Sequence, residues 1–211
     1  MNFQFTQEKN ARLFYQNNQA TIYLPENKTT EECVSHELLH LYMETKDNMV
    51  CGHIHGLILE KQNLRKIFHD ELINHVTNCI NHVKMLPIFC NMGYEKMSFL
   101  MDSYENKCEI SYAKKIKRNF KFLNSYSKLV IDNYIGKYFA MKADVSYINY
   151  SEQLKILSDT NADLFNTLEV FWNKWTNFDI ESNDCIDYWL DDFAGELVHS
   201  LDKWTMNKKI N

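Results

Sequence analysis

The sequence predicts an α+β protein in which helices predominate. Only 5 of its 211 residues are glycine and only 2 are proline, so tight turns should be rare and long helices common. Strand-like sequence is confined to the N-terminal region, where residues 20–24 are rich in β-branched and aromatic side chains and residues 13–15 form a second candidate strand. We therefore expect a short N-terminal β-sheet or hairpin followed by a helical C-terminal half.

The first predicted helix begins at a capping box, with Thr29 as N-cap and Glu32 three residues later. It should run to about residue 44 or 45. The side chains that we expect on its apolar side are Val34, Leu38, Leu41 and Tyr42.

The rest of the chain reads as further helices. We expect a loop at 47–56 and then a helix from 57 through 83 that ends near Pro87, followed by a helical turn that stops at Gly93. Amphipathic patterns predict four more helices, at residues 105–120, 122–142, 150–175 and 183–205. No linker separates these parts, so residues 105–211 should pack on residues 1–104 as one compact unit.

Composition excludes several classes of function. A net charge of −5 gives no general attraction to nucleic acid or to an anionic membrane, and no apolar run is long enough to cross a bilayer. Six cysteines without a CxxC pair, and an N-terminus without the features of a signal peptide, are typical of a cytoplasmic protein with reduced thiols. We expect neither nucleic acid nor membrane as a partner, and the sequence does not predict an oligomeric state.

The strongest chemical signal is the pentapeptide His36-Glu37-Leu38-Leu39-His40, which lies in the first predicted helix. Residues four apart share one face of a helix, so the two imidazoles can bind one zinc ion. Glu37 follows the first histidine, at the position from which a carboxylate can deprotonate a metal-bound water. This spacing predicts a zinc site with Glu37 as its catalytic residue.

Catalytic zinc sites use three protein ligands, so a third must come from elsewhere in the chain. A polar stripe on the second predicted helix offers candidates at steps of four, three and four residues: Glu71, His75, Asn78 and His82. Glu71 would complete a His-His-Glu set. His82 would complete a three-histidine set, which Asn78 could steady by hydrogen bonding. His75 is a further candidate, and the residue pattern alone leaves the choice open.

The run Asn78-Cys79-Ile80-Asn81-His82, with Pro87 shortly after it, resembles an element of small bacterial zincin-like proteins of the metallopeptidase type. In those proteins a His-Glu-x-x-His helix is followed by a helix that reads Asn-x-x-Glu-His. The resemblance covers about residues 20–95 and departs at Asn81, where the family has Glu, so no ligand role carries over to that position. It implies a zincin-like metal-binding core in residues 1–104, with His82 as third ligand and Asn78 as its support.

These features together predict a zinc-dependent hydrolase of the metallopeptidase type, with a peptide or protein as substrate. His36, His40 and His82 would bind Zn²⁺, and Glu37 would activate the zinc-bound water. The strand at residues 20–24 would align an extended substrate by edge pairing.

Two other interpretations start from the same residues. The first is a non-catalytic interaction protein that zinc stabilises. The second is a four-helix di-iron protein, because the Glu-x-x-His spacing of Glu37 and His40 recurs at Glu196 and His199. The further carboxylates that such a site needs would come from Glu71, Glu109 or Glu169.

A weaker candidate metal site lies in the loop predicted after the first helix. His53 and His55 are two residues apart there, close to Cys51. Because this spacing on an irregular loop is not specific for metal binding, we do not expect a site at these residues.

Overall fold

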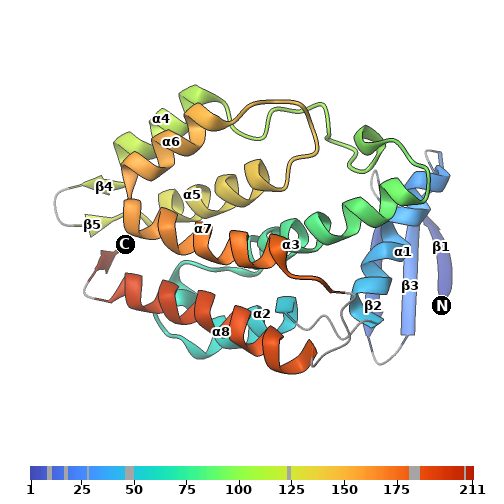
Figure 1. Ribbon diagram of the computed structural model, residues 1–211, viewed down its shortest axis with the longest axis horizontal. Helices are drawn as coiled ribbons and strands as arrows, with labels where there is room; N and C mark the ends of the chain where they lie inside the picture. Colours follow the sequence, from blue (N-terminus) through green and yellow to red (C-terminus); the bar gives the residue numbers. More distant parts are fainter. Residues whose placement is uncertain are drawn as a thin grey trace.

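A three-stranded sheet and the first helix form one end of the molecule, and the C-terminus lies at the other (Figure 1). The computed structural model describes residues 1–8, 11–16, 19–27, 29–45, 50–122, 125–180, 186–206 and 208–211. The strands of this sheet are β1 (Asn2–Thr6), β2 (Arg12–Gln16) and β3 (Gln19–Pro25). The two strands that the sequence predicts are confirmed as β2 and β3, whereas β1 was not predicted.

The order of strands in this sheet is β1-β3-β2. β3 pairs with β1 in parallel and with β2 in antiparallel orientation, so hydrogen bonds occupy both of its sides. A strand without a free edge cannot add an extended peptide to the sheet. The prediction that residues 20–24 align a substrate by edge pairing is therefore wrong.

Helix α1 (Glu31–Thr45) follows the sheet and is capped one residue later than predicted. The Thr30 hydroxyl accepts a hydrogen bond from the backbone N–H of Cys33 at 3.3 Å, which is the contact expected of an N-cap. Thr29 instead donates to the carbonyl of Pro25 at 2.6 Å. The predicted capping box of Thr29 and Glu32 is thus wrong.

The apolar side predicted for α1 is also wrong. The predicted side chains are half-buried, and the buried positions are Ser35, Glu37, Leu39 and Met43. Because these positions include Glu37, the helix turns part of its His-Glu-x-x-His motif inward rather than toward solvent.

Most of the loop predicted at residues 47–56 is instead helical, because α2 (Val50–Glu60) begins at Val50. Residues 47–49 of the predicted loop lie outside the described residues. Val50, Ile54 and Ile58 recur every four residues and are buried, and α2 packs against α8. Burial of this stripe stabilises the helix despite two glycines, each of which costs about 1 kcal/mol in a helix interior.

The helix predicted from 57 through 83 is interrupted by a short 3-10 helix, η1 (Leu64–Lys66). The next helix, α3 (Asp70–Asn91), continues past Pro87, so the predicted end near that residue is wrong. Gly93 has a φ of 95°, a conformation that favours glycine and confirms the predicted stop. A second 3-10 turn, η2 (Lys96–Ser98), follows.

The C-terminal half contains five further α-helices among the described residues: α4 (Ile110–Asn119), α5 (Lys128–Lys142), α6 (Ser151–Thr160), α7 (Ala162–Asn177) and α8 (Ile186–Thr205). The single helix predicted at 150–175 is wrong, because α6 and α7 are separate. Asn161 ends the first and caps the second, accepting a hydrogen bond from the N–H of Leu164 at 2.9 Å. A second small sheet of β4 (Lys121–Phe122), β5 (Ser125–Tyr126) and β6 (Lys209–Ile210) was not predicted.

The protein is α+β and 63% helical. Its larger core contains side chains from α2 through α8 and includes residues on both sides of residue 104. A smaller core lies between α1 and the second half of α3 and contains Leu39, Met43, Met85, Phe89, Phe99 and Val145. No helix in the described residues combines the length and the apolar composition needed to span a membrane.

Candidate metal centre

Three histidines from two helices meet at one point. His36 and His40 lie one turn apart on α1, and His82 reaches them from α3. The Nε2 atoms of His36 and His40 are 3.2 Å apart, and those of His40 and His82 are 3.3 Å apart. Ligand nitrogens about 2.05 Å from a tetrahedral zinc ion are separated by about 3.3 Å, which both measured distances match, and the candidate ligand atoms of all three histidines lie within 4.8 Å of one another.

The three imidazoles are held in the neutral form that metal ligands need. Burial lowers the pKa of His36 to about 4, with the backbone carbonyl of Phe99 acting in the opposite direction. Burial and the neighbouring His36 lower the pKa of His40 to about 3. The pKa of His82 lies well below its usual value, chiefly because of burial. The same Nε2 atoms that lie within hydrogen-bond distance of one another are those that a metal ion would bind.

Glu37 lies beside this cluster and is 7% exposed. Burial raises the pKa of its carboxyl group to about 7, while the backbone N–H of Leu13 on β2 favours the ionised form. A carboxyl group with a pKa near neutrality can both accept and return a proton at physiological pH. The sheet thus contributes directly to the site through β2.

An aromatic side chain that the sequence analysis did not single out forms one wall of the cluster. The ring of Phe99 lies 4.7 Å from that of His36 and 5.3 Å from that of His82, centroid to centroid. Phe99 is 2% exposed and belongs to the smaller core. It follows η2 in the chain, and no spacing rule connects it with the helices that it contacts, so no local pattern signals this role.

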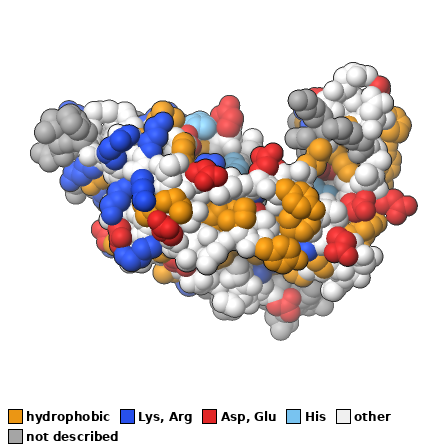
Figure 2. Space-filling model, turned by 90° about the horizontal axis from the view of Figure 1, so that it is seen from above, with side chains coloured by type: hydrophobic (Ala, Val, Ile, Leu, Met, Phe, Trp, Pro, Cys, Tyr) orange, Lys and Arg blue, Asp and Glu red, His pale blue; other side chains and the backbone are white. Residues whose placement is uncertain are grey.

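A cavity of about 740 Å³ opens beside the histidines. His36, Glu37 and His82 line one part of it, and other side chains from α1 and α3, from α5 and from the segment after η2 line further parts. The space-filling view shows the upper surface hollowed between the lobe at the right and the body of the molecule (Figure 2). Its size is in the range of pockets that hold small molecules or a few peptide residues.

The other members of the predicted polar stripe on α3 have different surroundings. Glu71 is exposed, pairs with His69 at 2.8 Å and lies about 16 Å along the helix from His82, so it does not reach the cluster. His75 lines the cavity but bonds the carbonyl oxygen of Gly136 at 3.0 Å. Asn78 also lines the cavity, and no hydrogen bond joins it to His82 among the described contacts.

The remaining candidate residues are not brought to this cluster. His53 and His55 lie on α2 rather than on a loop. On α8, Glu196 pairs with Lys174, and with His199 it lines a separate cavity between α7 and α8. Glu169 pairs with Lys142 at 3.0 Å. Within the part of the chain that the structure describes, the carboxylates of a di-iron centre do not converge.

Comparison of the chain with protein-family models, with curated proteins and with solved structures finds no match. The residues themselves therefore carry the functional argument. They can hold a divalent metal ion through three neutral imidazoles, with a buried carboxyl group and an open cavity next to it.

Proposed function

We propose that this protein is a zinc-dependent hydrolase that cleaves peptides. The observation that carries the proposal is the meeting of three Nε2 atoms, a buried glutamate and a cavity at one point. Each of these features occurs in proteins for structural reasons. Their combination is what hydrolysis of an amide at a metal requires.

Three imidazole ligands favour zinc among the common divalent ions, since magnesium and calcium prefer oxygen ligands. When bound, zinc polarises a carbonyl group and lowers the pKa of a water molecule toward neutrality. His36, His40 and His82 would hold the ion without competition from protons at neutral pH.

Glu37 supplies the proton transfer. Its carboxylate would accept a proton from the attacking water and pass it to the nitrogen of the leaving group. The backbone N–H of Leu13 keeps the carboxyl group oriented. Phe99 packs on two of the histidines and forms part of the wall of the cavity from which a substrate would approach.

A purely structural zinc site is the main alternative, and the ligand count argues against it. Structural sites are closed by four protein ligands, whereas catalytic sites have three and leave one position open. Among the described residues the cluster has three, and the cavity lies beside it. A structural site would also have no use for a buried carboxyl group next to the ligands.

The substitution Glu37→Gln tests the proposal. Zinc-loaded protein would be incubated with a mixture of peptides of varied sequence, and mass spectrometry would identify the products. We expect Glu37→Gln to keep one zinc ion per chain and to lose about 10²–10⁴-fold in turnover, which is the usual contribution of a general base. The matched control is Glu196→Gln, in the second Glu-x-x-His of the chain, which should leave turnover unchanged. Wild-type turnover in Glu37→Gln would overturn the proposal.

A further inference from the structure

A lysine lines the cavity next to the candidate metal centre. The Lys107 side chain is 9% exposed, and lysine is rarely buried to this degree without a partner for its charge. Its partner is Asp102. The Nζ atom lies 2.6 Å from the carboxylate of Asp102 and also donates to the carbonyl oxygen of the same residue at 2.6 Å.

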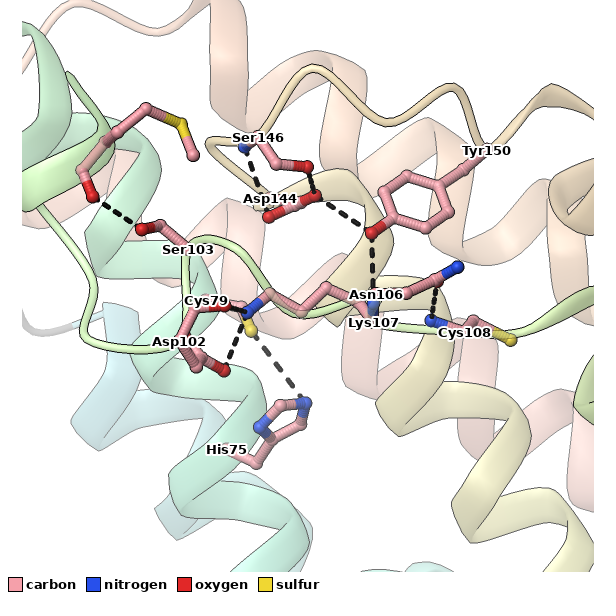
Figure 3. Close-up of polar contacts among 11 residues, drawn as sticks. His75, Cys79, Asp102, Ser103, Asn106, Lys107, Cys108, Asp144, Ser146 and Tyr150 are labelled. Carbon is pink, nitrogen blue, oxygen red and sulfur yellow. Dashed lines mark hydrogen bonds and ion pairs between the residues drawn. The ribbon is translucent and has the colours of Figure 1, made fainter.

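The backbone of Lys107 is fixed by the segment between α5 and α6 and by the first turn of α6. Its N–H donates to the hydroxyl oxygen of Tyr150 at 3.0 Å, and that hydroxyl donates to Asp144 at 2.9 Å (Figure 3). The side-chain amide of Gln153 donates to the carbonyl oxygen of Cys108 at 3.0 Å. Lys107 is thus in position before any ligand enters, so binding to it would cost little ordering entropy.

The ammonium group has one donor left for a ligand. An ammonium carries three N–H bonds, and the two contacts to Asp102 use two of them. No other acceptor contacts Nζ among the described residues. The side chain of Asp102 is 53% exposed, so water hydrates its charge, whereas Lys107 is the charge that is withdrawn from solvent.

Lys107 lines the same cavity as His36 and His82. Its side chain extends over α3 at Cys79, three residues before His82 (Figure 3). Burial and the negative charge of Asp102 raise the pKa of the Cys79 thiol to about 12, and the nearby positive charge of Lys107 acts against this rise. One helical turn spans about 5.4 Å and one extended residue at most about 3.6 Å. A group bound at Lys107 would therefore lie one or two residues from a bond cleaved at the metal.

We propose that Lys107 binds a carboxylate group of the substrate, one or two residues from the scissile bond. This inference rests on the proposed function and names its substrate class. The carboxylate is either the C-terminus of a peptide or the side chain of an aspartate or glutamate residue. Both sources present the same two oxygens to the remaining N–H of the ammonium.

Four hydroxamate probes test this inference without requiring turnover. Each consists of malonyl monohydroxamate, which binds the metal, joined to alanine, alanine amide, glutamic acid α-amide or lysine amide. The dissociation constant of each would be measured by calorimetry on zinc-loaded protein. We expect the alanine probe or the glutamic acid probe to bind about 10–100-fold more tightly than alanine amide, as charge-assisted hydrogen bonds do. Whichever of the two binds more tightly identifies the source of the carboxylate.

Variants of the ion pair separate ligand binding from a merely structural role of Lys107. Lys107→Met should abolish the preference for carboxylate, and Lys107→Arg should retain part of it. Asp102→Asn leaves the ammonium unopposed and should increase the affinity for the carboxylate probes. If Lys107 only anchors its loop to Asp102, Asp102→Asn and Lys107→Met should instead weaken all four probes alike. Lys115→Met, at an exposed position on α4, is the matched control and should change nothing.

The outcomes distinguish this inference from the proposed function. Equal binding of all four probes by the wild-type protein would overturn the role of Lys107 and leave the metal centre intact. Preference for the lysine amide probe would also overturn it, and would assign recognition of a cation to Asp102 and Asp144. Failure of every probe to bind zinc-loaded protein would instead contradict the open metal centre itself.

Discussion

Two segments of this chain carry the same Glu-x-x-His spacing, and the fold treats them differently. In α1, Glu37 is buried and His40 lies within 3.3 Å of an imidazole from another helix. In α8, Glu196 is half-exposed and forms an ion pair with Lys174 across the surface of α7 and α8. The spacing places two side chains on one face of a helix in both cases. A cluster that could hold a metal ion forms only where a second helix supplies a further imidazole and burial favours the neutral form of all three.

The largest difference between the two segments should appear in metal affinity. We expect His82→Ala to weaken zinc binding by the order of 10³-fold, because a total binding free energy of about 10–16 kcal/mol is shared among a few ligands. His199→Ala should leave the affinity unchanged. Competition with a chromophoric chelator measures both. Equal affinities of the two variants would show that His82 is not a ligand.

A second difference should appear in the pH dependence of stability without metal. The pKa of Glu37 is about 7 in the folded protein and about 4.5 in the unfolded chain, so the folded state binds more protons between these values. Its contribution to stability is fully present below pH 4.5 and is lost as the pH rises through 7. The unfolding free energy of Glu37→Gln, measured relative to that of wild type, should therefore rise by up to about 3 kcal/mol between pH 4.5 and 8.

Chemical denaturation of wild-type and variant protein at several pH values measures this effect, and the subtraction removes contributions from the histidines. Glu196→Gln is the control, because the carboxyl group that it removes is half-exposed. A difference between Glu37→Gln and wild type that does not change with pH would mean that Glu37 is not buried as described.

The smallest effects should come from the caps of two helices. Thr30 caps α1, which carries the metal motif, and Asn161 caps α7, which lies against α8. Thr30→Ala and Asn161→Ala should each cost about 1 kcal/mol of unfolding free energy. The sequence alone predicted Thr29 as the cap of α1. If Thr30 is the cap instead, Thr29→Ala should lower the unfolding free energy by less than Thr30→Ala does. Thermal unfolding of the zinc-free variants measures all three.

The part of the site that could be predicted is the part that depends on helical periodicity. His36, Glu37 and His40 have a recognisable spacing, and the stripe on α3 narrowed the third ligand to four residues that included His82. Periodicity could not rank His82 above His75 or Glu71, because that ranking depends on how α3 crosses α1. The structure brings His82, and neither of the others, to within 4.8 Å of both His36 and His40.

The rest of the site depends on contacts between segments far apart in the chain. Phe99 and Lys107 lie in an irregular segment between α3 and α4, and Leu13 reaches Glu37 from an edge strand. No local pattern marks such residues. The recurrence of Val50, Ile54 and Ile58 every four residues is a helical pattern, and it corresponds to α2. The glycines and histidines between these residues led instead to the prediction of a loop. Burial against α8 outweighed the local preference.

The account is tested most directly by the anomalous diffraction of a zinc-loaded crystal, recorded on both sides of the zinc absorption edge. It predicts one peak per chain, bonded to the Nε2 atoms of His36, His40 and His82, with Glu37 beside it and the cavity open on the remaining side. A peak at another group of residues, a fourth protein ligand that closes the site, or no peak at these histidines would contradict it.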